Sequence, residues 1–294
     1  LDVRNSDIVM AAGVSGGIWK STDGGNTWAP KLPNGSNLSI SFLAQDPVNN
    51  NVWYATTGEV YNSTASDKGS TANYTGAGMY KSTDNGESWS LMTYVYDSNN
   101  LAFDKEAIPN TDIVSNSEIF PFSITSKVLI HDFSGVSTIF VCSYSLGIWF
   151  SSDGGQSFKR FGGSLTNSEY SNYADIVIDD NDNITLWFGP TDSSSNGFFR
   201  SLDGGNTFSS LTPPDYSIAG SEARCILALA PSQQSTVYAF LYDNPGSGEQ
   251  NHFYFFDFSS FDSGGSATFA NRSSNLPTFE RSDFGGVEEF STQG

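Results

Sequence analysis

The chain is poor in basic residues, and it has no long hydrophobic run. Its 13 Lys and Arg residues stand against 32 Asp and Glu residues, for a net charge of −19. Nucleic acids and anionic membrane surfaces repel such a protein, so neither is expected as a partner. No apolar run reaches the roughly 18 residues of a transmembrane helix, and direct membrane insertion is not expected either. No signal peptide is visible, but Leu1 is not an initiator residue, so a processed or excised chain is expected.

Cysteine and histidine are also scarce, which limits metal and nucleophile chemistry. Cys142 and Cys225 fall on separate strand-like segments, where buried free thiols are favoured over a disulfide. His131 and His252 are isolated, so neither metal-ligand spacing nor Ser-His-Asp or Cys-His catalysis gains support. The segment 179–183 superficially resembles a calcium loop, but it lacks the invariant glycine and is interpreted as a turn. We expect no metal and no cofactor.

Against this background, one eight-residue motif recurs four times, each time after a short strand that opens with glycine. A fifth, degraded copy is expected at Ser260-Phe-Asp-Ser-Gly-Gly. Repeats at intervals of 50–69 residues are typical of repeat architectures. The four clear copies are Ser21-Thr-Asp-Gly-Gly-Asn-Thr-Trp28, Ser82-Thr-Asp-Asn-Gly-Glu-Ser-Trp89, Ser151-Ser-Asp-Gly-Gly-Gln-Ser-Phe158 and Ser201-Leu-Asp-Gly-Gly-Asn-Thr-Phe208.

The motif has the residues that a hairpin turn needs. Its aspartate accepts backbone N–H bonds, its glycines supply positive φ, and its closing aromatic begins the next strand. A residue that recurs once per module is expected to hold the module together rather than to bind a metal or catalyse a reaction. We therefore assign a structural role to Asp23, Asp84, Asp153 and Asp203.

Two further strand-like runs precede each motif after the first. They are β-branched or aromatic, too short for helices, and bounded by Pro, Asn, Asp and Gly. Four antiparallel strands per repeat predict an all-β fold, the β-propeller built of four-stranded blades. The approximate blades are residues 6–31, 38–92, 126–161, 173–211 and 222–271, within a single propeller segment spanning 1–294.

The pattern Ser-x-Asp-x-Gly-x-Thr-Trp resembles the Asp-box, or bacterial neuraminidase repeat, over roughly residues 6–270. It is similar to repeats of sialidases, xyloglucan-cleaving glycoside hydrolases, sortilin-type receptors and non-enzymatic surface proteins. The strings Asp46-Pro-Val-Asn-Asn-Asn-Val-Trp-Tyr-Ala-Thr-Thr-Gly-Glu59 and Gly76-Ala-Gly-Met-Tyr-Lys-Ser-Thr-Asp84 look most like large extracellular proteins of Bacteroidetes. The resemblance implies the fold and a secreted or cell-surface location, but not a chemistry.

Two departures from the enzyme families weaken a catalytic interpretation. Sialidases hold their substrate with three arginines, one in an Arg-Ile-Pro-like segment. None of the six arginines here lies in such a segment: Arg4, Arg160, Arg200, Arg224, Arg272 and Arg281. In the xyloglucanases a catalytic Asp precedes a Gly-Gly-aromatic strand, and Val14 occupies the matching position. Valine cannot act as a general base.

The two ends of the repeat array are incomplete in the sequence. The first module starts at its second strand, and residues 282–294 do not complete a blade. We expect both ends to be open and the chain to be part of a larger propeller. A five-bladed ring closed by its own ends is the competing interpretation.

Ligand sites in propellers of this resemblance lie on the face opposite the aspartate turns, so we searched the loops of that face. The segments from Gly58 to Gly76 and from about residue 93 to 125 are long and rich in tyrosine and carboxylates. Tyrosine rings stack on sugars while polar groups bind hydroxyls, although a flexible polar decoration is equally compatible. The candidate ligand-binding residues are Glu59, Tyr61, Tyr74, Tyr144, Asp192 and Tyr216.

These features favour an extracellular, non-catalytic binding or display module. Its expected partners are a glycan or protein ligand and the remaining domains of the same polypeptide. No catalytic residue is assigned. The alternatives are a xyloglucanase- or sialidase-like glycoside hydrolase that uses carboxylates of the same loops, and a purely structural spacer.

Overall fold

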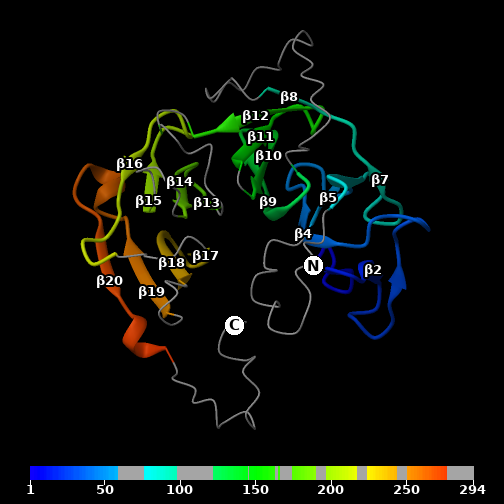
Figure 1. The fold of residues 1–294 in the computed structure, drawn as a ribbon, viewed down its shortest axis with the longest axis horizontal. Coiled ribbons are helices and arrows are strands. Elements are labelled where there is room, and N and C mark those ends of the chain that lie inside the picture. The colour runs from blue at the N-terminus through cyan, green and yellow to red at the C-terminus, as the bar shows by residue number, and fades with distance from the viewer. Residues whose placement is uncertain are drawn as a thin grey trace. The chain divides into compact units, whose positions relative to one another are not determined.

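The computed structural model of the chain consists of β-sheets, whose strands are labelled in Figure 1. It describes residues 1–58, 76–97, 122–144, 146–162, 165, 174–189, 197–216, 224–243 and 250–276. The chain divides into two compact units, Leu1–Ala174 and Asp175–Gly294. In the described part, no helix is both long and apolar enough to cross a membrane.

The first unit begins with two antiparallel sheets. The first sheet has three strands, in the order β1 (Val9–Gly13), β2 (Gly17–Ser21) and β3 (Ala29–Pro30). The second has four, in the order β4 (Ile40–Gln45), β5 (Trp53–Thr57), β6 (Met79–Ser82) and β7 (Ser90–Leu91). Each box motif forms the hairpin between the last two strands of its sheet.

The third sheet contains one strand that the sequence pattern did not predict. Its antiparallel core is β9 (Thr125–Phe133), β10 (Val136–Ser143), β11 (Gly147–Ser151) and β12 (Ser157–Phe161). The fifth strand, β8 (Val95–Asp97), lies parallel to β12 at the edge of the sheet. We expected residues 93–125 to lack regular structure, and this expectation was wrong at β8. Three residues that pair only with a distant strand leave too short a pattern to detect.

The second unit holds two four-stranded sheets. The fourth sheet comprises β13 (Ala174–Ile178), β14 (Ile184–Phe188), β15 (Gly197–Ser201) and β16 (Ser209–Ser210). The fifth comprises β17 (Arg224–Ala230), β18 (Gln233–Asp243), β19 (Gln250–Asp257) and β20 (Thr268–Asn271), with the 3-10 helices η4 (Phe261–Ser263) and η5 (Ser273–Asn275).

Neighbouring sheets within a unit pack face to face through their alternating side chains. We call the face that packs on the following sheet the forward face and the opposite one the backward face. Ile18 on the forward face of the first sheet is buried with Tyr80 on the backward face of the second. Met79 on the forward face of the second sheet is buried in the same way with Trp149 of the third. Successive side chains of a strand point to opposite faces of its sheet. Tyr80 and Met79 of β6 therefore pack on the sheet before and the sheet after, respectively.

The degraded fifth motif does not form the turn of the other four. Residues 261–263 adopt a 3-10 helix that ends at Gly264, which has a left-handed φ of 89°. The carboxylate of Asp262 accepts hydrogen bonds from Arg200 of the preceding sheet. The segment still joins the antiparallel strands β19 and β20, so a fifth hairpin is present, but Asp262 bonds to Arg200 in place of the box contacts within its own turn.

Candidate functional site

The four box turns share one hydrogen-bond pattern. In the first, the Ser21 hydroxyl donates to Asp23 Oδ1 at 2.7 Å and accepts from the Gly25 N–H at 2.8 Å. The N–H of Thr27 donates to Asp23 Oδ1 at 2.8 Å, and its hydroxyl donates to Oδ2 at 2.6 Å. Gly25 has a φ of 92°, which explains the glycine at this place. The carboxylates of Asp84, Asp153 and Asp203 accept the corresponding bonds.

These bonds occupy both oxygens of each box carboxylate and stabilise its charged form. The hydroxyl and N–H of Thr27 and the hydroxyl of Ser21 lower the pKa of Asp23 to about 2. Ser88 does the same for Asp84, whose pKa is also about 2. A carboxylate this strongly acidic, with its oxygens bound inside its own turn, is a poor proton acceptor and a poor metal ligand.

No group of three or more His, Cys, Asp or Glu side chains that could hold a metal ion occurs in the described residues. The segment 179–183 forms the turn between β13 and β14, where Asp179 Oδ1 accepts the N–H groups of Asn181 and Asn183. Cys142 and Cys225 are buried and form no disulfide, as expected.

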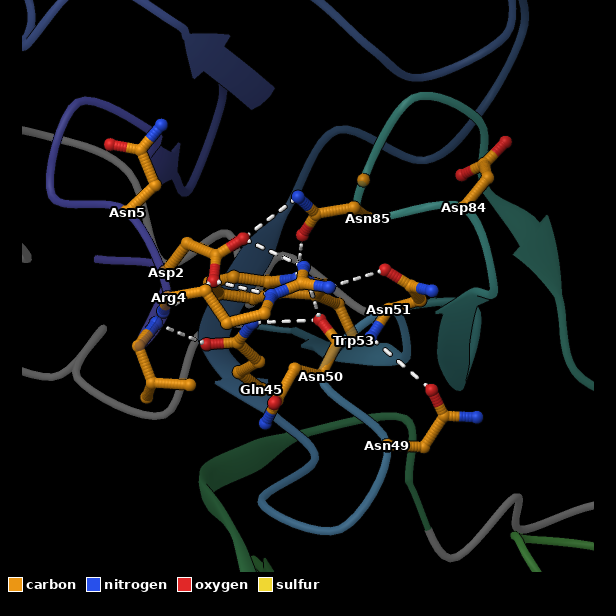
Figure 2. Close-up of polar contacts among 12 residues, drawn as sticks. Asp2, Arg4, Asn5, Gln45, Asn49, Asn50, Asn51, Trp53, Asp84 and Asn85 are labelled. Carbon is orange, nitrogen blue, oxygen red and sulfur yellow. Dashed lines mark hydrogen bonds and ion pairs between the residues drawn. The ribbon is translucent and has the colours of Figure 1, made fainter.

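A polar cluster clamps the N-terminal segment onto the turns of the second sheet (Figure 2). The Arg4 guanidinium donates to both carboxylate oxygens of Asp2, at 3.1 and 2.9 Å, and to Asn51 Oδ1 at 2.7 Å. Asn85 donates to Asp2 Oδ2 at 2.8 Å and accepts the indole N–H of Trp53 at 2.8 Å. The Arg4 hydrogen bonds hold the pKa of Asp2 well below its usual range. Because the charges are paired with each other, this cluster acts as a structural clamp.

Two lysines connect the second and third box turns to the sheet before each of them. Lys20, next to the first box, donates from Nζ to the carbonyl oxygen of Asn85 and to Glu87, both at 2.7 Å. Lys81, next to the second box, donates to the carbonyl oxygen of Gly154 at 2.8 Å. Each lysine therefore reaches the box turn of the following sheet. Burial lowers the pKa of Lys81.

Arg200 holds the corresponding place in the second unit. Its Nη2 donates to Asp179 at 2.8 Å and to Asp262 at 2.6 Å, and Nε donates to Asp262 at 2.7 Å. Nη1 donates to the Thr185 hydroxyl at 2.8 Å, and the guanidinium lies 4.3 Å from the ring centroid of Phe258. This fully buried arginine links two sheets and is enclosed by them, unlike the substrate-binding arginines of sialidase-like proteins.

At the other end of the strands, the described residues that follow the segments 59–75 and 98–121 meet. The N–H of Gly76, which follows the segment 59–75, donates to the carbonyl oxygen of Ser123 at 2.7 Å. Ser123 follows the second long segment. The Thr57 hydroxyl accepts the N–H groups of Ala77 at 2.9 Å and Gly78 at 3.0 Å, and it donates to the Gly78 carbonyl oxygen at 2.6 Å. The bases of both segments are therefore fixed to each other.

Close backbone contacts complete this place. Gly58 has a φ of 90°, and a Cβ there would lie 2.8 Å from Ile124 Cα, so a side chain does not fit. The N–H of Tyr144 donates to the carbonyl oxygen of Ile124 at 2.9 Å. The hydroxyl of Thr125 donates to the Thr57 carbonyl oxygen at 3.0 Å. We define the loop junction as Thr57, Gly58, Gly76, Ser123, Ile124 and Tyr144.

Aromatic residues on either side of the segment 98–121 in the sequence pack together. Tyr94 lies before the segment and Phe122 lies after it, and their ring centroids are 5.0 Å apart. Phe122 is fully buried and also packs on Phe158 at 4.8 Å and on Trp149 at 6.2 Å. Tyr94 and Phe122 therefore belong to one packed core.

The loop junction and the box turns lie at opposite ends of β5. Trp53 begins this strand and bonds to Asn85 in the box turn, whereas Thr57 ends it at the junction. Four residues of strand separate the two by about 13 Å.

The predicted ligand residues have different positions relative to the junction. Tyr144 belongs to it. Tyr216 lies in the second unit, where its ring packs on Phe198 and Tyr254 and its hydroxyl accepts the Trp187 indole N–H at 3.1 Å. The remaining candidates, Glu59, Tyr61, Tyr74 and Asp192, fall outside the described residues.

The described residues form five β-sheets, and the solved structures that they resemble show an all-β fold of the β-propeller type. This confirms the fold class predicted from the motif. No family model and no curated protein sequence matches the chain.

The similar solved structures include two GH74 enzymes. One is an ancestral GH74 enzyme, at a TM-score of 0.59 and 16% identity, over 94% of this chain and 31% of that chain. Another is the GH74 xyloglucanase from Xanthomonas campestris, at 0.55 and 14%, over 92% and 37%. The chain spans about a third of the length of each. At these identities the similarity establishes the fold.

Proposed function

We propose that the chain is an extracellular, non-catalytic binding module of a larger secreted or cell-surface protein. Its ligand is a glycan or a protein, bound by the loops that rise from the loop junction. The observation that carries this proposal is the hydrogen bond from Gly76 to Ser123, which joins the end of the tyrosine-containing segment 59–75 to the end of the segment 98–121. Binding residues are often found on loops that a rigid scaffold positions.

The chemistry of these segments supports a glycan as the first ligand to test. Glu59, Tyr61 and Tyr74 belong to the segment that ends at Gly76, and Tyr144 lies at its base. Tyrosine rings with neighbouring carboxylates suit the apolar faces and hydroxyls of a sugar. The box aspartates are occupied within their turns, which leaves the opposite end of the strands for recognition.

A glycan array that includes xyloglucan, followed by calorimetry on any hit, tests the proposal. The variant Glu59→Gln/Tyr74→Ala should lose at least ten-fold in affinity for that glycan. The control Asp180→Asn, an exposed carboxylate in the turn after β13, should bind normally. Unchanged affinity in the double variant would move the site elsewhere, and an array without any hit would favour a protein ligand or a spacer role.

A glycoside hydrolase that uses carboxylates of the same loops is the second candidate. The similarity to two GH74 enzymes over more than nine-tenths of the chain favours it. Val14, in the turn between β1 and β2, argues against it, because the expected base is missing there. Incubation with xyloglucan and sialylated glycans, followed by an assay for released sugar, distinguishes the hydrolase from the non-catalytic binding module. We expect no product, and a product that depends on Glu59 would favour the hydrolase.

A further inference from the structure

Two box turns are contacted by a methionine of the sheet before them. A Cβ on Gly86 of the second box would lie 2.6 Å from Met10 Cε and 3.0 Å from Met10 Sδ. A Cβ on Gly155 of the third box would collide with Met92 Cε in the same way. The φ angles of the two glycines are 79° and 86°, which also favours glycine at both places. Each methionine therefore fills the space that a side chain on the box glycine would need.

These methionine contacts lie beside the lysine contacts with the same turns. Met10 is the cross-strand partner of Lys20, whose Nζ donates to the carbonyl oxygen of Asn85 at 2.7 Å. Lys81 donates at 2.8 Å to the carbonyl oxygen of Gly154, which directly precedes the contacted glycine of the third box. One polar and one apolar contact from the preceding sheet therefore hold each of the two turns.

The chain has three methionines, and they differ in their access to solvent. Met10 and Met92 are partly exposed and pack against two hydrophobic cores. Met79, which begins β6, is fully buried inside one of these cores. An oxidant in solution therefore reaches Met10 and Met92 more readily than Met79, and exposed thioethers are commonly oxidised to sulfoxides.

A sulfoxide does not fit the place that Met10 occupies. It adds an oxygen and a strong dipole to a side chain that packs between the box glycine and an aromatic core. The indole N–H groups of Trp53 and Trp89 in that core already donate to Asn85 and Gly86, and the Gly86 N–H donates to the box serine. These N–H groups are therefore not free to bind the new oxygen, and a polar group buried without a partner destabilises the fold.

The site of Met92 has the same restrictions. It packs against the core that contains Trp149 and Phe158. The indole N–H of Trp149 donates to Leu146, and the N–H of Gly155 donates to the serine of its own box. Oxidation of either methionine should therefore separate its box turn from the preceding sheet.

We propose that Met10 and Met92 are oxidation sites at which hydrogen peroxide loosens the second and third box turns from the sheets before them. The sulfur lone pair attacks one peroxide oxygen, so that an S–O bond forms and the O–O bond breaks. The other oxygen leaves as water with both protons. Sulfur loses two electrons and the peroxide gains them. This modification is separate from ligand binding and does not depend on the proposed function.

Titration of the 294-residue chain with hydrogen peroxide, followed by peptide mass spectrometry, tests the assignment. Met10 and Met92 should each gain one oxygen at least ten times faster than Met79. The Tm of the oxidised protein should fall by at least about 3 °C. In hydrogen exchange, peptides covering 82–89 and 151–158 should exchange faster after oxidation. The first box turn, 21–28, is the internal control, because none of the three described methionines lies beside Gly25.

Met10→Leu/Met92→Leu is the matched variant, because leucine has a similar volume and no sulfur to oxidise. Its Tm should not change under peroxide. The two single variants replace it if the double variant unfolds, and each should lose less Tm than the wild-type chain. Three outcomes would overturn the proposal: Met79 reacting as fast as the other two, an oxidised wild-type chain that keeps its Tm, or a double variant that loses as much Tm as the wild-type chain.

Discussion

The N–H of Gly76 and the carbonyl oxygen of Ser123 form a 2.7 Å hydrogen bond that ties together the bases of two long segments. Thr57 fixes one base through Ala77 and Gly78, and Tyr144 is bonded to Ile124 beside the other. Fixed ends restrict the conformations open to any segment between them, and this lowers the entropic cost of binding a ligand.

Thr57→Val removes the hydroxyl that fixes this base and keeps the side-chain volume. Two N–H groups then lose their acceptor, so the free energy of unfolding should fall by about 1–3 kcal/mol. Affinity for a glycan bound at the junction should fall at least ten-fold. Thr56→Val on the same strand is the matched control, because that hydroxyl bonds to Ser41 instead. Urea denaturation and calorimetry measure both effects, and equal affinities in the two variants would contradict the role of the junction.

Asp153→Asn tests the box carboxylate as a structural element. Asp153 accepts the N–H groups of Gln156 and Ser157 and two hydroxyls. An amide has only one oxygen to accept them, so we expect a loss of about 1–3 kcal/mol in stability by urea denaturation. Asp180→Asn, exposed in another turn, should lose less than about 0.5 kcal/mol. A box variant as stable as this control would show that the carboxylate is dispensable.

Acid should destabilise the protein within a defined pH range. The pKa values of Asp23 and Asp84 are about 2 in the folded protein, below the ordinary value of about 3.9 of an unfolded aspartate. A lowered pKa adds stability that is fully present above the unfolded value and is lost as the pH falls through the folded value. Stability should therefore decline between about pH 4 and pH 2. NMR titration of the box carboxylates checks the cause, and midpoints near 4 would contradict it.

Arg200→Met tests the cation that joins the fourth and fifth sheets. It leaves Asp179, which is buried, and Asp262 without their ion pair, and breaking a buried pair costs about 3–5 kcal/mol. Adding Asp262→Asn to this variant should restore part of the loss, because one unpaired charge disappears. Denaturation of the four species of the cycle measures the coupling. Purely additive losses would show that the two side chains do not interact.

Local features of the fold could be predicted from the sequence. The contacts of Asp23 reach only from Ser21 to Thr27, so a short motif contains the whole turn. The strands that flank the turn could also be predicted from the residue types along a short stretch of sequence. Burial of Cys142 and Cys225 without a disulfide could also be predicted from their positions in strands.

Long-range polar contacts could not be predicted in this way. Arg4 reaches Asn51, and Lys20 reaches Glu87, through pairings that depend on how separate sheets pack. No spacing in the sequence indicates which residues of separate sheets will be hydrogen-bond partners. Asp262 looked like a degraded box residue for the same reason, since its actual partner, Arg200, belongs to another repeat. The junction itself depends on one backbone bond between Gly76 and Ser123, which no side-chain pattern reveals.

Hydrogen-exchange mass spectrometry with a saturating ligand tests the central claim most directly. If loops on the loop junction recognise the ligand and the box turns only hold the sheets, protection should appear in peptides covering 57–78, 122–125 and 144. Peptides covering the box turns at 21–28 and 82–89 should exchange as in the free protein. Protection confined to the box turns, with none around the junction, would contradict the account.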